Sequence, residues 1–257
     1  MLNGFDKQQI KIKKKGIRYP VDVTLSEING MNFLQITVRV FFLLPDYYET
    51  EFSKEKINLW KSNILAGFQC WQGEYKVFGN QPLKVIVSVE EVDSPVDAVI
   101  VSTIQDKLQR KLSYLDKEKR KKWMNRYLGM RRDFASIGKK WSATSRKVIF
   151  FRDSSIKSPS TITNIAKHEF GHCLGLGDMY RDPASGFLGI RKPDYKEIRS
   201  FYMQDYQYNL VMCNNGTVSD NDIEMVLLAF SENRMQHYQK SMFDKEQMIS
   251  RALGRGN

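Results

Sequence analysis

The sequence has few of the features that would place it in several common classes of protein. It has three cysteines in 257 residues and no C-x-x-C pair, which argues against a disulfide framework and against a second, structural zinc site. No apolar run approaches the 18 residues of a membrane span. No apolar segment follows the lysine-rich start, Met1 to Lys15, as a secretory signal peptide requires. We therefore expect free thiols, no membrane span, and a chain that is cytoplasmic as made unless a dedicated system exports it.

The charge of the chain is concentrated in one region. Residues 107–147 contain fifteen Lys and Arg against three acidic residues, an excess of +12, whereas the whole chain carries +11. Three interpretations of this basic segment stay open: a solvated helix face, an electrostatic lip that favours acidic substrates or an anionic cell surface, and nucleic-acid binding. Nucleic acid ranks lowest as a partner, because no recognised nucleic-acid motif accompanies the charge.

Hydrophobic periodicity predicts strands and one covering helix ahead of residue 152. With 42% hydrophobic residues, the chain can bury a full core. The expected strands are residues 19–25, 33–44, 83–89, 98–102 and 148–151, with the second central in the sheet. A helix is expected at 52–71 and a turn at Gly73, Gly79 and Pro82. In the basic segment, the first half is expected to be helical and residues 135–140 an edge strand.

Two features are expected later in the chain. The glycines and prolines of residues 181–200 favour an irregular loop that faces substrate. Ser219-Asp220 is expected to cap a final helix, and its apolar stripe is Ile223, Val226, Leu227 and Phe230.

The stretch from His168 to Asp178 carries most of the chemistry that the sequence offers. The chain has only three histidines, and two of them lie here, four residues apart. On a helix this spacing places His168 and His172 on one face, where both can bind one metal ion. Glu169 lies about 100° around the helix from His168. A carboxylate placed beside the metal can act as a general base toward a water without occupying a coordination position.

The ends of this helix are marked as well. Pro159-Ser160-Thr161 offers a capping hydroxyl at the start. The face opposite the histidines is apolar and is expected to meet the core, so that the histidine face meets a cleft; it comprises Ile162, Ala166, Phe170, Cys173 and Leu174. Gly175 is expected to end the helix in a left-handed conformation, and the reversal can bring Asp178 back as a third ligand. Two nitrogens and one carboxylate leave a fourth position for water, as in catalytic zinc sites.

These residues resemble a known signature. Residues 168–178 are similar to the metzincin zinc peptidase motif H-E-x-x-H-x-x-G-x-x-H, with Asp178 in place of the third histidine. An aspartate followed two residues later by Tyr180 resembles the snapalysin-like branch. Asn209-Leu210-Val211-Met212-Cys213 resembles the metzincin Met-turn, in which a methionine lies beneath the metal, and Met212 is the candidate.

The resemblance implies a fold and a function. The fold is α+β: a twisted mixed sheet packed on helices, with the zinc helix at the cleft and a C-terminal subdomain that ends in a helix. A single metallopeptidase domain would span residues 1–257, with an upper part at 1–178, including a basic insertion at 107–147, and a lower part at 179–257. The implied protein is a monomeric zinc-dependent endopeptidase with one catalytic zinc ion and a protein or peptide substrate, in which Glu169 is the general base.

Several assignments stay open at this stage. Asp182 competes with Asp178 for the role of third ligand. Tyr180 either stabilises the oxyanion or packs as an ordinary aromatic residue, and Met212 is either the floor of the site or a core filler. Cys173 is expected to be a small buried apolar residue, and His237 a surface or packing histidine rather than a ligand.

Two other functions compete with the peptidase. The chain can be a zinc hydrolase that acts on an amide or ester outside proteins, or a non-catalytic effector or binding module with a structural metal. Glu169 favours an enzyme, because a purely structural ion gives no reason for a carboxylate to stand beside it.

Overall fold

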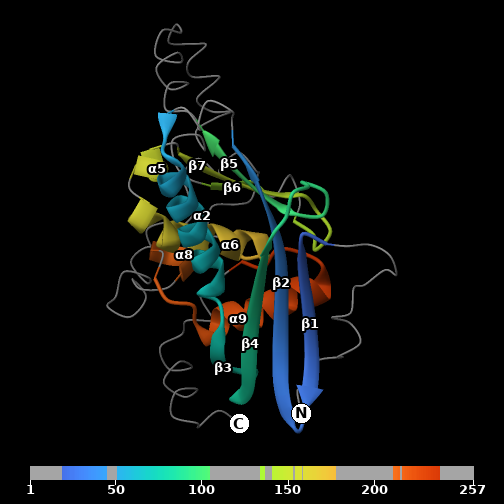
Figure 1. Ribbon diagram of the computed structural model, residues 1–257. Helices are drawn as coiled ribbons and strands as arrows, with labels where there is room; N and C mark the ends of the chain where they lie inside the picture. The colour runs from blue at the N-terminus through green and yellow to red at the C-terminus, as the bar shows by residue number, and fades with distance from the viewer. Residues whose placement is uncertain are drawn as a thin grey trace, which may run out of the picture.

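The computed structural model describes residues 19–44, 51–104, 134–136, 141–152, 154–157, 159–177, 211–214 and 216–237. These residues form a mixed α+β fold, a curled mixed sheet with three longer helices (Figure 1). The longer helices are α2 (Lys54–Gln69), α6 (Ile162–Cys173) and α9 (Asp220–Glu232), and the short helical turns are α5 (Ser154–Lys157), η2 (Pro159–Thr161) and α8 (Val211–Asn214). The α+β class expected from the sequence is therefore confirmed.

The described sheet has seven strands in the order β3-β4-β2-β5-β7-β6, with β1 also paired to β2. The strands are β1 (Val21–Ile28), β2 (Met31–Leu43), β3 (Gly73–Val77), β4 (Gln81–Glu91), β5 (Val99–Ile104), β6 (Phe134–Ser136) and β7 (Lys147–Arg152). Strand β2 is central, as expected, and runs parallel to β4 and β5. One edge of β2 is shared, because residues 31–38 pair with β1 and residues 40–43 pair with β5.

Burial alternates along the central strands. In β2, Leu34, Ile36 and Val38 are fully buried, while Gln35 between them is exposed. In β4 the exposed positions include Ile86. Since successive strand residues point to opposite faces, one face of the sheet forms the core and the other lies at the surface. Helix α2 contacts β4, and α6 contacts β7 and β6.

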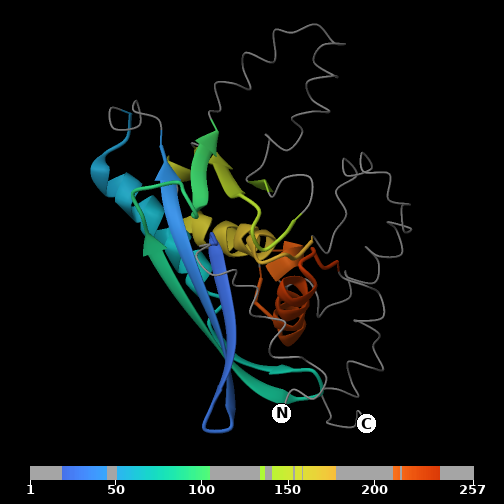
Figure 2. The same cartoon turned by 90° about the vertical axis from the view of Figure 1, so that its right-hand side faces the viewer.

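Two hairpins form the lower end of the sheet in Figure 2. The β1–β2 hairpin turns through Asn29-Gly30, whose φ angles of 52° and 76° suit the two-residue turn that matches strand twist. The β3–β4 hairpin corrects the sequence analysis, because Gly73–Val77 is a strand where a turn was expected. Only residues 78–80 form the turn, and β3 pairs antiparallel with β4.

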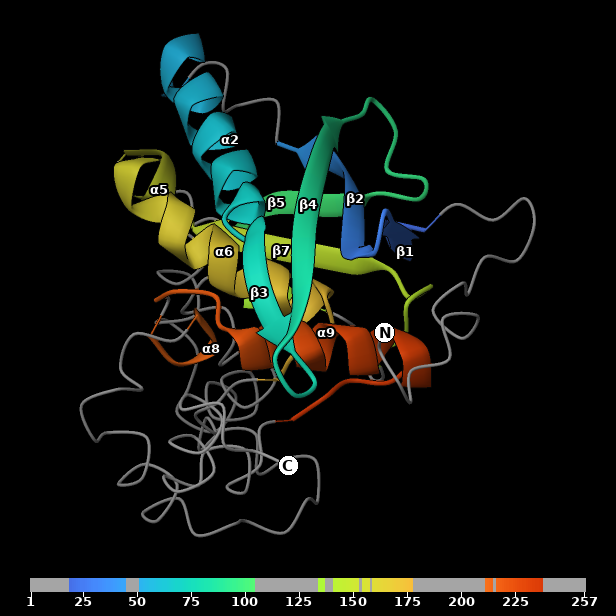
Figure 3. The same ribbon diagram turned by 90° about the horizontal axis from the view of Figure 1, so that it is seen from below.

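Strand β3 is held by contacts that the local sequence does not show. The main-chain N–H of Lys76 donates to Asp220 Oδ1 at 2.9 Å, and that of Phe78 donates to Glu224 Oε1 at 2.6 Å. Both carboxylates belong to the first turns of α9, which runs beside the β3–β4 hairpin (Figure 3). The hairpin and the last described helix therefore support each other across more than 140 residues of sequence.

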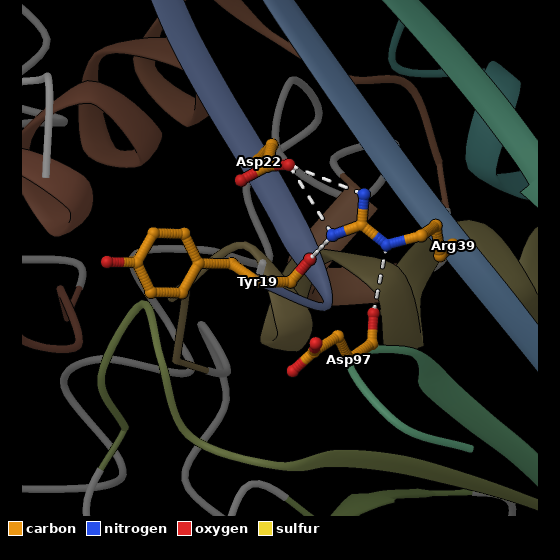
Figure 4. A network of polar contacts seen from close by, with 4 residues as sticks. All are labelled: Tyr19, Asp22, Arg39 and Asp97. Atoms are coloured by element: carbon orange, nitrogen blue, oxygen red, sulfur yellow. Dashed lines mark hydrogen bonds and ion pairs between the residues drawn. The ribbon is translucent and has the colours of Figure 1, made fainter. Parts of the chain in front are cut away.

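A polar network joins the start of the sheet to the loop before β5 (Figure 4). Arg39 Nε donates to the main-chain oxygen of Asp97 at 3.1 Å. The same guanidinium donates to the main-chain oxygen of Tyr19 and lies 3.4 Å from the Asp22 carboxylate. Because the arginine and the aspartate are only 14% and 16% exposed, this pair is partly shielded from water and ties three segments together.

Helices α2 and α6 approach each other closely at Gly67. A Cβ added to this glycine would lie 2.5 Å from the main-chain oxygen of Thr163 and 2.7 Å from the Cβ of Ala166. Contacts this short do not occur between real atoms, so any side chain at Gly67 would push the helices apart. Phe68 and Phe170, stacked with ring centroids 4.5 Å apart, pack next to this crossing.

We expect Gly67→Ala to destabilise the protein by about 1 to 3 kcal/mol, the usual cost of overpacking a core. In an uncrowded helix the same substitution stabilises by about 1 kcal/mol, because glycine is a poor helix former. Urea denaturation compares the variant with Gln69→Ala, an exposed position at the end of the same helix. An increase in the free energy of unfolding for Gly67→Ala would show that the crossing has room for a methyl group.

Several expectations fall partly or wholly outside the described residues. Most of the basic segment, including its expected helix, is outside them, and so is the loop at 181–200. The expected edge strand at 135–140 is confirmed for residues 135 and 136, which belong to β6 at one end of the described sheet, while residues 137–140 lie outside the described ranges. None of the helices in the described ranges has the length and apolar composition that a bilayer span requires.

Candidate metal centre

Helix α6 carries both histidines of the motif and is fixed from its apolar face. Ile162, Ala166, Phe170 and Cys173 are fully buried, as expected from their spacing. Trp71 packs edge-on against Phe170, with centroids 6.3 Å apart, and its Nε1 donates to the main-chain oxygen of Lys167 at 3.0 Å. The backbone just before His168 is thus held by a buried indole.

The start of α6 differs from the expectation. Thr161 is the N-cap residue, but its side chain makes no capping hydrogen bond. Its φ and ψ of −86° and −13° are helical, because the turn η2 leads directly into the helix. The capping hydroxyl predicted at Pro159-Ser160-Thr161 is therefore wrong for Thr161.

The two histidines form a compact pair. Their ring centroids lie 5.0 Å apart and the rings are nearly perpendicular, at 89°. Nδ1 of His168 lies 2.8 Å from the main-chain oxygen of Val211, and Nδ1 of His172 lies 2.7 Å from that of Leu176. A carbonyl oxygen can only accept, so each hydrogen bond requires the proton on Nδ1. In a neutral imidazole this leaves the lone pair on Nε2, the atom that binds a metal.

The histidine face is more buried than the sequence suggested. His168 is 4% exposed and Glu169 5% exposed, while His172 is partly buried. Helix α8 shields part of this face from solvent. The main-chain oxygen of Val211 is hydrogen-bonded to His168, and Met212 packs on α6 at Gly171. The expected cleft beside these histidines depends also on residues after 177, which lie outside the described ranges.

Met212 lies against the motif helix at Gly171. It is fully buried, and a Cβ added to Gly171 would lie 2.4 Å from the Met212 sulfur and 3.0 Å from a ring carbon of Trp71. The glycine in the middle of the motif therefore gives the methionine and the indole the space they occupy. Val211 N also donates to Thr217 O at 2.9 Å, which anchors this turn.

Gly175 ends α6 in the way the sequence predicted. Its φ is +94°, and the N–H groups of Gly175 and Leu176 donate to the oxygens of His172 and Gly171 at 3.1 and 3.0 Å. This pair of bonds is the Schellman motif. The reversal turns the Leu176 carbonyl back toward the helix, where it accepts from His172. The helix stop and the orientation of the second histidine thus have one cause.

A buried lysine supports the loop behind this turn. Trp141 donates from Nε1 to the main-chain oxygen of Cys173 at 3.1 Å, and its ring is in contact with Gly175. Lys147 Nζ lies 5.1 Å from the centre of the Trp141 ring and donates to the oxygens of Ser142 and Ser145 at 2.9 and 3.0 Å. Burial lowers the pKa of Lys147 to about 8. These contacts hold Trp141 in place.

Cys173 is a core residue, as expected. It is fully buried, and burial raises the pKa of its thiol to about 12, with the Glu169 carboxylate adding to the rise and Lys147 opposing it. The thiol is therefore protonated at neutral pH and packs as a small apolar residue among the buried side chains of α6.

The described site contains two candidate nitrogen ligands. Asp178, Asp182 and Tyr180 lie outside the described residues. Within the described ranges, no group of three or more His, Cys, Asp or Glu side chains is placed to hold a metal ion. The third histidine, His237, is exposed and lies against Gly177, the last described residue before Asp178.

No model of a known protein family, no curated protein and no solved structure matches this chain.

Proposed function

We propose that this protein is a zinc-dependent endopeptidase with a metzincin-like site. The observation that carries the proposal is the hydrogen bonding of the two histidines. Both Nδ1 atoms lie at hydrogen-bond distance from main-chain oxygens, which places the proton of each ring on Nδ1 and the lone pair that can bind a metal on Nε2. Such fixed partners are typical of metal-binding histidines, whose tautomer and ring direction must be set before the ion arrives.

The chemistry follows from the residues around that pair. Zinc, when bound, acts as a Lewis acid that activates water for attack on a carbonyl carbon. Glu169, the neighbour of His168, accepts the proton of the attacking water and delivers it to the leaving amine. Asp178 completes the ligand set and Tyr180 assists the developing negative charge on the carbonyl oxygen. Met212 packs against the motif helix at Gly171 and supports it there.

The position of β6 supports a peptide as the substrate. This strand ends the described sheet, pairs with β7 on one side, and contacts α6. An extended peptide can add to a sheet edge through main-chain hydrogen bonds, which brings a carbonyl group past the helix without requiring one particular side chain. This arrangement suits an endopeptidase better than a hydrolase of small esters.

Zinc content measured on purified protein tests the proposal. We expect about one equivalent in the wild type, and loss of bound zinc in His168→Ala and His172→Ala, because each variant removes one of few ligands. Asp178→Ala should bind zinc more weakly, whereas Asp182→Ala should bind it normally. The reverse result for the two aspartates would make Asp182 the third ligand.

Cleavage assays decide among the enzyme classes. We expect chelator-sensitive hydrolysis of casein or gelatin and inhibition by a hydroxamate, which requires an open coordination position. Hydrolysis of small esters without proteolysis would point to a different zinc hydrolase. Zinc binding without inhibition or turnover would indicate a structural metal, and a wild type without zinc would overturn the proposal.

A further inference from the structure

The chain returns to the candidate metal centre after α9. Asn233 ends that helix in a left-handed conformation, with φ of 51°, and residues 235–237 then run beside residues 175–177. Gln236 N donates to Gly175 O, and Gly177 N donates to Gln236 O, both at 2.8 Å. We call residues 235–237 the return segment. Its main chain holds both sides of Leu176, whose carbonyl accepts from His172.

The side chain of His237 adds a second contact. A Cβ added to Gly177 would lie 2.4 Å from His237 Nδ1 and 2.9 Å from its Cε1. The imidazole therefore occupies the space where a side chain at residue 177 would begin. Gly177 does not have the positive φ of Gly175, so an alanine is compatible with its backbone and is opposed mainly by the ring of His237.

The turn that holds His172 is closed by the two hydrogen bonds of the Schellman motif, from the N–H groups of Gly175 and Leu176. Two of its residues, Gly175 and Gly177, are glycines, which lose the most conformational freedom when they are ordered. The Leu176 carbonyl fixes the second histidine only if this turn stays in one place. The return segment adds to this restraint from elsewhere in the chain, because it makes hydrogen bonds on both sides of Leu176.

We propose that the return segment positions the metal centre, with His237 as a positioning residue that restrains Gly177 and hence the turn that orients His172. This inference rests on the proposed zinc site. His237 is not a ligand in this arrangement, because it forms no metal-binding group with the other two histidines within the described residues. It acts on the site through the turn at Gly175–Gly177.

Four variants test this role: His237→Ala, Gly177→Ala, the double variant, and Arg234→Ala as an exposed control just before the return segment. Zinc affinity is measured by competition with a chromophoric chelator, and ligand geometry by the visible spectrum of the cobalt-substituted protein. We expect His237→Ala to weaken zinc binding about 10-fold, the lower end of what outer partners of ligands contribute, and to alter the cobalt spectrum. The melting temperature should change little, since His237 is exposed.

The double variant separates a positioning role of His237 from unrelated losses of zinc affinity. Gly177→Ala displaces the ring, so it should reproduce the effect of His237→Ala, and the double variant should be no weaker than either single one. Unchanged zinc affinity and cobalt spectrum in His237→Ala, with a wild type that binds zinc, would overturn the positioning role and leave the proposed function standing. A wild type that binds no zinc would overturn both.

Discussion

Replacing Glu169 by glutamine is expected to lower the rate of peptide hydrolysis by roughly 10² to 10⁴-fold while zinc remains bound. Glutamine keeps the size and polarity of the side chain but cannot accept the proton of the attacking water. The histidines keep their main-chain partners, Val211 and Leu176, so the two proposed zinc ligands should keep their orientation. Steady-state cleavage of a peptide substrate, zinc content and thermal unfolding are measured on the same preparation.

The matched control for this variant is Glu74→Gln, which makes the same chemical change on an exposed position of β3. It should cleave like the wild type. If Glu169→Gln retained activity within a few fold of the wild type, Glu169 would not be the base. If it lost zinc as well as activity, the carboxylate would be a ligand and not a neighbour of the ion.

The largest effect on stability is expected from Gly175→Ala, which should lower the free energy of unfolding by about 2 to 5 kcal/mol. A left-handed backbone costs a residue with a Cβ about 1 to 2 kcal/mol. The added methyl group would also lie 2.7 Å from the Cβ of Ala229 and 2.8 Å from a ring carbon of Trp141, and overpacking of this kind costs about 1 to 3 kcal/mol. Denaturation in urea measures the loss.

Gly30→Ala separates the two causes. Gly30 also has a positive φ, +76°, but nothing lies within 4 Å of an added Cβ. It should therefore show the backbone cost alone. Equal losses for the two variants would mean that Trp141 and Ala229 move aside without cost. Because Gly175 directs the Leu176 carbonyl to His172, its alanine variant should also bind zinc more weakly than Gly30→Ala.

The sequence predicted those parts of the site that depend on neighbours along the chain. The spacing of His168 and His172 and the reversal at Gly175 follow from helix geometry and from the conformational freedom of glycine. The sequence also predicted a cap for α9 at Ser219-Asp220, and Ser219 is the N-cap residue. Its N–H donates to the Asp222 carboxylate at 2.6 Å, as part of a capping box. The apolar stripe of α9 is buried as expected; it comprises Ile223, Val226, Leu227 and Phe230.

The errors arose where distant segments decide the outcome. In the sequence, Gly73, Gly79 and Pro82 predict a turn where the structure has strand β3. Its pairing with β4 and the carboxylates of α9 stabilise it as a strand. His237 was expected to be a surface or packing histidine; it is exposed and packs on Gly177, but its position beside the site could not be read from a residue 60 positions away.

The sequence by itself determined a helix with two histidines on one face, a glycine stop, and a carboxylate beside the first histidine, because these features repeat with the period of the helix. Only the tertiary structure decided which atoms orient the histidine rings and hold the helix and its final turn in place. The oxygen that orients His168 comes from Val211, 43 residues later. The space for Met212 exists because Gly171 has no side chain, and the return segment holds the turn from the far side of α9. Such contacts depend on packing between distant segments, which leaves no periodic trace in the sequence.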